Sequence, residues 1–151
     1  MNPNQPVKLL LDECLGRPLV VDINKMLSWD TPIPTIHHLT NYFKPGELDP
    51  DWIPKVASEG WIILTADRGR KGKDKLPSIC LAYKVTHILM GSSVMKMKQY
   101  KKANAIISIW EKIKECSHAP RGSRFIMSSI NGRTILKQVI LPTIVLPPPS
   151  S

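Results

Sequence analysis

Three aspartates stand where segments of regular structure are expected to end or begin. Asp12 follows the apolar run Val7–Leu11, Asp67 comes just after the apolar run Trp61–Thr65, and Asp49 precedes a proline at the expected start of a helix. Carboxylates that share one site repel each other unless a cation neutralises them. Mg²⁺ and Mn²⁺ prefer oxygen ligands of this kind. The sequence therefore predicts a divalent metal site formed by Asp12, Asp49 and Asp67.

Two further acids and several simpler roles stay open. Glu13 can reach either the metal or its own helix, because consecutive residues at a strand end point to opposite faces. Asp51 lies two residues from Asp49 and can replace it as the third ligand. Asp12 and Asp49 can also act only as helix caps, and Asp67 can pair with a cation in a solvated turn.

A strongly basic segment follows Asp67 within a chain that is basic as a whole. The 151 residues contain 21 Lys and Arg against 12 Asp and Glu, a formal charge of +9. Such a charge favours a polyanionic partner, since basic side chains contact phosphates. An anionic membrane and a merely solvated loop are the alternatives. We predict that RNA is bound by the cations of this segment: Arg68, Arg70, Lys71, Lys73 and Lys75.

The elements that must position these side chains follow from apolar runs and helical periodicity. Strands are expected at residues 7–11, 34–39, 61–65 and 85–90, with a turn at 91–93. Helices are expected at residues 15–27, 49–58 and 77–84, and a long amphipathic helix at 97–116. Two last strands, 124–130 and 133–140, flank the hairpin signal Asn131-Gly132. This order predicts an α/β fold with a mainly parallel sheet covered on both faces, plus a C-terminal β-hairpin.

In a parallel sheet, the carboxyl ends of the strands meet at one edge, where ligands bind. Asp12 and Asp67 approach each other there if their two strands are neighbours.

The sequence does not indicate a second kind of site. The three cysteines are odd in number and widely spaced, which indicates reduced, buried thiols. They form no zinc-binding pattern with the histidines. The apolar runs are too short for a signal peptide or a membrane span, so we expect a soluble cytoplasmic protein.

The segments Leu9-Leu10-Leu11-Asp12-Glu13, Asp49-Pro50-Asp51-Trp52-Ile53-Pro54 and Gly60 to Asp67 together resemble a PIN-like domain. The resemblance covers about residues 7–116 and is greatest to VapC-like toxins of toxin–antitoxin pairs. It implies a three-layer α/β/α sandwich that binds Mg²⁺ or Mn²⁺, cleaves RNA and is held inactive by an antitoxin protein. Asp12, Asp49 and Asp67 match the family's acids. Where a fourth acid is often found, this chain has Gly91-Ser92-Ser93, which leaves the number of metal ions open.

From these features we expect a polar extension at residues 1–6, a nuclease domain at 7–116, a hairpin extension at 117–145 and a proline-rich tail at 146–151. The expected function is a Mg²⁺- or Mn²⁺-dependent endoribonuclease, the toxin of a toxin–antitoxin pair. The apolar stripe of residues 97–116 permits a homodimer. Two rivals remain: a receiver-like domain in which Asp67 accepts phosphate, and a non-catalytic module that binds RNA or a protein partner through its cations.

Overall fold

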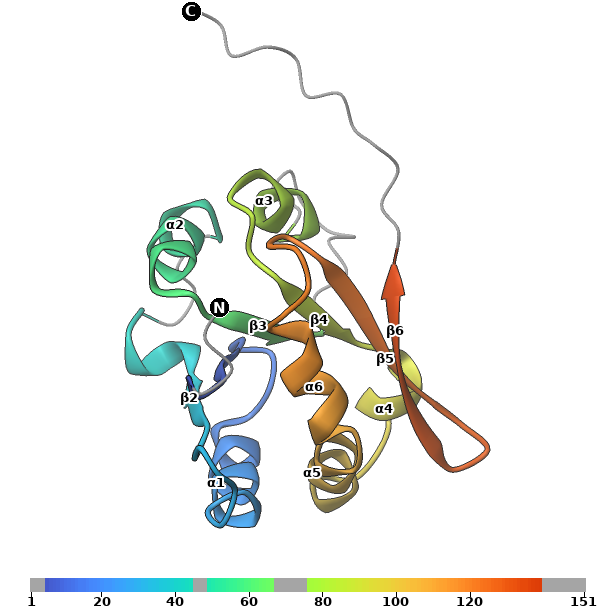
Figure 1. Cartoon of the computed structure of the whole chain (residues 1–151). Helices are drawn as coiled ribbons and strands as arrows, with labels where there is room; N and C mark the ends of the chain where they lie inside the picture. Colours follow the sequence, from blue (N-terminus) through green and yellow to red (C-terminus); the bar gives the residue numbers. More distant parts are fainter. Residues whose placement is uncertain (1–4, 45–48, 67–75, 140–151) are drawn as a thin grey trace, which may run out of the picture.

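A single six-stranded sheet forms the centre of the molecule. The computed structural model describes residues 5–44, 49–66 and 76–139, with only the backbone described at 49–51 and 76–78. The order of strands across the sheet is β2-β1-β3-β4-β5-β6, and all neighbours are parallel except β5 and β6. The strands span Lys8–Leu11 (β1), Thr35–His38 (β2), Ile62–Thr65 (β3), His87–Met90 (β4), Arg124–Ile130 (β5) and Arg133–Val139 (β6). The predicted α/β fold with a mainly parallel sheet and a C-terminal hairpin is confirmed (Figure 1).

Helices cover the sheet on both faces (Figure 1). On one face lie α1 (Arg17–Met26), α5 (Gln99–Ser108) and α6 (Trp110–Cys116), and on the other lie α2 (Asp49–Glu59) and α3 (Leu76–Ala82). Two short elements complete the described chain: a 3-10 turn, η1 (Leu39–Asn41), after β2, and α4 (Ser92–Met95) after β4. Among the described residues, every helix is too short or too polar to cross a bilayer.

The apolar runs of the central strands contribute side chains to two separate hydrophobic cores, one on each face of the sheet. Leu9 and Leu11 pack on the side of α1, α5 and α6, whereas Leu10 between them packs on the side of α2 and α3. Successive residues of a strand point to opposite faces, so a strand covered on both faces must be apolar throughout. All four residues of β3 are buried for this reason.

The C-terminal hairpin belongs to the same sheet as the other strands. Residues Arg124–Ile130 pair with β4 in parallel and with β6 in antiparallel fashion. The turn uses Asn131 at φ 52° and Gly132 at φ 76°, and two positive φ values in a two-residue loop suit the twist of the flanking strands. The turn extends well beyond the other strands (Figure 1).

The prediction of one long amphipathic helix at residues 97–116 is wrong in detail, because two helices form there instead. Ile109 leaves helical geometry, with φ −113° and ψ 19°, between the end of α5 and the start of α6. The break lies beside β-branched isoleucines, which have low helix propensity. The turn expected at residues 91–93 is also corrected, since α4 begins at Ser92.

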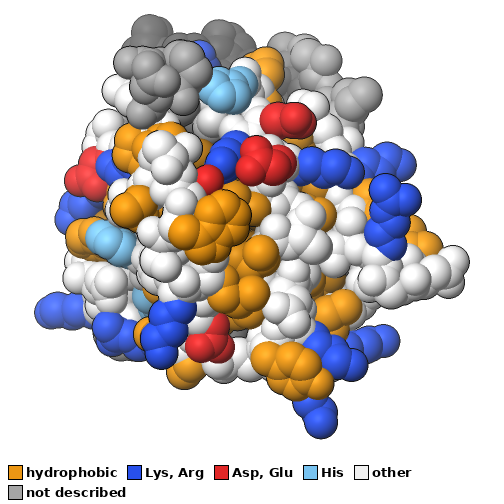
Figure 2. All heavy atoms as spheres, turned by 60° about the horizontal axis from the view of Figure 1, so that its bottom comes forward, with side chains coloured by type: hydrophobic (Ala, Val, Ile, Leu, Met, Phe, Trp, Pro, Cys, Tyr) orange, Lys and Arg blue, Asp and Glu red, His pale blue; other side chains and the backbone are white. Residues whose placement is uncertain are grey.

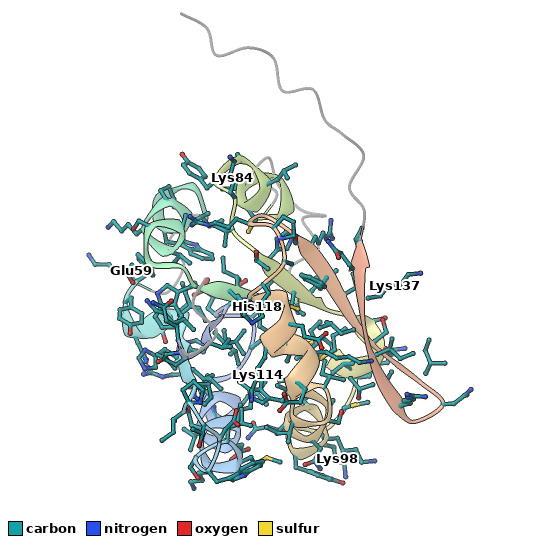
Figure 3. The ribbon with its side chains drawn as sticks, in the orientation of Figure 1. Glu59, Lys84, Lys98, Lys114, His118 and Lys137 are labelled. Atoms are coloured by element: carbon teal, nitrogen blue, oxygen red, sulfur yellow. The ribbon has the colours of Figure 1, made fainter. Side chains whose placement is uncertain are left out.

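A polar contact joins the loop after α1 to α6. Asp30 accepts a hydrogen bond from the Trp110 indole at 2.8 Å and forms an ion pair with Lys114 at 2.9 Å. Lys114 lies on α6, near the centre of the view in Figure 3, and its side chain is partly exposed. Desolvation opposes ionisation of Asp30, but the hydrogen bonds from Lys114 and Trp110 outweigh it and lower the pKa of the carboxyl. The contact therefore helps to hold α6 against the loop that leads into β2.

Candidate active site

Asp12 lies at the carboxyl edge of the sheet, where it follows β1 directly and lies beside the end of β3. Strands β1 and β3 pair in parallel with Leu11 opposite Leu64, and the Asp12 N–H continues the ladder by donating to the Leu64 carbonyl at 2.9 Å. The two strands that precede Asp12 and Asp67 are therefore neighbours, which is the condition under which the sequence places these two acids near each other. The Asp12 residue is only 7% exposed, which is unusual for an aspartate.

The Asp12 carboxylate is oriented by hydrogen bonds from both strand ends. The Thr65 hydroxyl donates to Oδ2 at 2.8 Å, and the Glu13 N–H donates to Oδ1 at 2.8 Å. The first residue before α1 is Gly16, and no side chain caps that helix. Gly16, and not Asp12, is therefore the N-cap residue of α1.

Cys14 completes this group of polar side chains, which the sequence alone did not reveal. Its thiol donates to Asp12 Oδ2 at 3.6 Å, and its sulfur accepts from the Ala66 N–H at 3.3 Å, which links the loop after β1 to the end of β3. Desolvation and the nearby charge of Asp12 raise the pKa of Cys14 to about 11, so the thiol is protonated at neutral pH. Cys80 and Cys116 are buried, as expected. Cys14 as a whole residue is exposed, although its thiol is desolvated, so the prediction of three buried cysteines is wrong for Cys14.

A buried histidine fixes the loop that carries Asp12. His38 ends β2 opposite Leu11, and its Nε2 lies 2.6 Å from the Leu15 carbonyl. A carbonyl only accepts, so Nε2 carries the proton and Nδ1 accepts from Thr40. Because both ring nitrogens have partners, His38 is a structural residue that positions residues 13–15.

The other predicted site residues fall largely outside the described side chains. Asp49 is the first residue of α2, and the side chains of Asp49 and Asp51 are not described. Asp67 and the predicted RNA-binding cations Arg68, Arg70, Lys71, Lys73 and Lys75 also lie outside the described residues. Glu13 is exposed beside Asp12. Within the described part of the chain, no group of three or more His, Cys, Asp or Glu side chains is arranged to hold a metal ion.

The fold and the position of Asp12 define a class of protein: an α/β domain with a mainly parallel sheet and a buried acid directly after the first strand. A family model described as "PIN like domain" matches residues 7–82, about half of the chain. The chain belongs to the PIN-like domain family. PIN domains are generally nucleases that act on RNA or other nucleic acid, and they typically use divalent metal ions. No curated protein and no solved structure matches the chain.

Proposed function

We propose that this protein is a metal-dependent endoribonuclease and the toxin of a toxin–antitoxin pair. The observation that supports this most is the buried Asp12 carboxylate, which the Thr65 hydroxyl of the neighbouring strand orients at 2.8 Å. Asp67 follows Thr65 by two residues in the sequence. The same segment of chain, residues 7–82, is the part that matches the PIN-like family.

The Asp12 carboxylate is the type of donor that a hard divalent cation binds. Asp12 offers carboxylate oxygens that are held in place by hydrogen bonds, and Mg²⁺ and Mn²⁺ prefer oxygen donors. In this proposal Asp12, Asp49 and Asp67 hold the ion, with Glu13 or Asp51 as further ligands. A bound ion of this kind lowers the pKa of water and offsets negative charge that develops on a phosphodiester.

The side chains around Asp12 have a positioning role. Thr65 and the Glu13 N–H each donate to a different carboxylate oxygen, so the carboxylate cannot rotate without losing a hydrogen bond. Groups that orient a ligand in this way are worth roughly 10–100-fold in metal affinity or activity. The basic segment, with Arg68, Arg70, Lys71, Lys73 and Lys75, would hold the RNA backbone over this edge.

The surface charge suits a polyanionic substrate. Lys and Arg side chains outnumber Asp and Glu on the face drawn in Figure 2, in line with the formal charge of +9. A cognate antitoxin that covers the acidic edge is the partner that this function entails, and the apolar stripe of residues 97–116 permits a homodimer. Co-purification of the protein with the product of a neighbouring small gene, followed by inhibition of cleavage, would test the antitoxin.

The decisive experiment is RNA cleavage by the purified protein with Mg²⁺, Mn²⁺ or EDTA. We expect cleavage that requires the metal and falls at least about a hundredfold in Asp12→Asn and in Asp67→Asn, because loss of a ligand should cost more than loss of a group that orients one. Asp22→Asn is the matched control: Asp22 lies on α1, accepts a hydrogen bond from Gln99, and can still accept it as Asn. Circular dichroism checks that all variants fold.

The other outcomes separate the rival functions. Cleavage that ignores EDTA and both site substitutions would contradict the proposed site. RNA binding without cleavage, unaffected by Asp12→Asn, would favour the non-catalytic binding module. Phosphorylation of Asp67 by a small phosphodonor, with no cleavage, would favour the receiver-like domain.

A further inference from the structure

A groove on the sheet begins next to the candidate active site. It has a volume of about 370 Å³ and lies along β4 and β5, where it is lined by Leu89, Gly91, Ser92, Ser93, Arg124, Ile126 and Ser128. Thr65, Leu89 and Ile126 are paired in register across β3, β4 and β5. Paired residues of parallel strands share a face and lie about 5 Å apart. The floor of the groove is therefore continuous with Thr65, the residue that orients Asp12.

Among the described residues, the helices α2 and α3 of the other core do not pack on β5. Phe125 and Met127 of β5 point into the core formed with α5 and α6. Their neighbours Arg124, Ile126 and Ser128 point to the opposite face and are only partly buried. The described residues of the core beneath α2 and α3 include none from β5.

Arg124 is the one cation among the described residues that line the groove, and none of them is acidic. Among the described residues Arg124 makes no ion pair, and its buried Nε has no hydrogen-bond partner. An unpaired buried donor is costly for a fold, and a guanidinium matches the geometry of a phosphate. A phosphate bound here would supply the partner that Arg124 lacks.

Hydroxyl groups stand at the other end of the groove. Ser92 and Ser93 follow β4, and Ser128 lies on β5. Ser93 Oγ already accepts from the Ser129 N–H at 2.9 Å, so its own proton remains to donate to a ligand oxygen. Between these hydroxyls and Arg124 lies the apolar floor of Leu89 and Ile126. Polar ends with an apolar middle suit the sugar–phosphate chain and base face of a single strand.

We propose that this groove binds a segment of single-stranded RNA that continues from the active edge, with Arg124 contacting a phosphate. The groove residues lie beyond residues 7–82, so the family match does not assign them a role. The identity of the ligand as RNA rests on the proposed nuclease function. The position of the groove and the lack of a hydrogen-bond partner for Arg124 Nε do not depend on the proposed nuclease function.

The test is binding of a short fluorescein-labelled oligouridylate, measured by anisotropy in EDTA over a range of salt concentrations. Arg124→Gln should weaken binding about tenfold, as expected for a charged hydrogen bond, and should reduce the salt slope by about 0.7 for one lost phosphate contact on a single strand. Lys112→Gln is the control, since it removes the same charge from an exposed position on α6. It should change affinity much less.

The unfolding temperature of the Arg124→Gln variant tests whether Arg124 has only a structural role. Because Arg124 makes no ion pair among the described residues and its buried Nε has no hydrogen-bond partner to lose, Arg124→Gln should unfold at about the same temperature as the wild type. A large loss of stability with unchanged RNA affinity would overturn the proposal. Crosslinking of a 4-thiouridine oligonucleotide should label peptides from β4, α4 or β5, and labelling confined to other elements would also overturn it.

Failure of this proposal can be told apart from failure of the nuclease function, because binding in EDTA involves no turnover. Cleavage by the wild type together with equal RNA binding by Arg124→Gln would reject the groove and keep the nuclease. Binding that depends on Arg124 without any cleavage would keep the groove and reject the nuclease. If the wild type does not bind the oligouridylate, or if an acidic peptide binds through Arg124 in its place, the RNA groove is rejected.

Discussion

Burial of single side chains sets which residues can change charge in the folded protein. His87 of β4 is 1% exposed, and desolvation lowers its pKa from 6.5 to about 4, with the charge of neighbouring Arg124 acting in the same direction. Its Nδ1 lies 3.3 Å from the Val85 carbonyl. Within the described residues, Nε2 has no hydrogen-bond partner. The folded protein therefore keeps this histidine neutral in mildly acidic solution.

The depressed pKa of His87 predicts a loss of stability at acid pH. Between pH 6.5 and about 4, the unfolded chain binds a proton at this residue and the folded chain does not, so the free energy of unfolding falls as the pH falls. We expect His87→Gln to remove this part of the pH dependence, worth about 2–3 kcal/mol between neutral pH and pH ~4.5. Urea unfolding of both proteins at the two pH values measures it. Parallel pH dependence in wild type and variant would contradict the prediction.

At the scale of elements, the contact between β4 and β5 depends on a close approach at Gly91. The Gly91 N–H donates to the Met127 carbonyl at 2.8 Å, and a Cβ at position 91 would lie 2.8 Å from the same oxygen. A backbone atom cannot move aside as a flexible side chain can. The glycine thus permits the end of β4 to join β5 and shapes the carboxyl edge between the active site and the groove.

Gly91→Ala should therefore destabilise the protein by about 1–3 kcal/mol, the usual cost of overpacking. Gly16→Ala is a suitable comparison, because a Cβ there meets only Pro18 Cδ at 3.5 Å. It should cost less than about 1 kcal/mol, mainly through a poorer residue before α1. Denaturant unfolding of the two variants tests this, and equal stability would show that β4 and β5 adjust without strain.

At the scale of the whole molecule, the segment that matches the family model is only part of one cooperative core. Leu9, Leu11, Ile62 and Leu64, within residues 7–82, pack with residues of β4, α5, α6 and β5 that lie beyond it. Removal of the later elements would leave only α1 to cover that apolar face of the sheet, which α5 and α6 also cover in the full chain. Folding of the first part should therefore require the second.

We expect a fragment of residues 7–82 to be unfolded, since the apolar area that it leaves uncovered no longer offsets the entropy of ordering the chain. Circular dichroism and the dispersion of amide proton shifts in NMR spectra would show this, with the full chain as the folded control. A cooperative unfolding transition of the fragment would contradict the prediction and would identify the later elements as an independent addition.

Much of the local structure could be predicted from the sequence because its causes are local. Continuous apolar runs mark strands covered on both faces, Asn131-Gly132 marks the hairpin turn, and Asp12 follows its strand directly. The interruption at Ile109 was missed, since residues on either side keep one helical stripe of buried side chains. The predicted roles of Asp49, Asp51, Asp67, Glu13 and the basic segment 68–75 stay predictions.

Only the tertiary structure decided which strand ends meet. The pairing of β1 with β3 brings Thr65 and Ala66 to Asp12 and Cys14, although about fifty positions of chain separate them. The parallel pairing of β5 with β4 likewise places Arg124 and Ser128 beside Ser92 and Ser93 in one groove. Strand order depends on how two cores close around one sheet. No single stretch of sequence carries that information, whereas each strand and turn depends on its own residues.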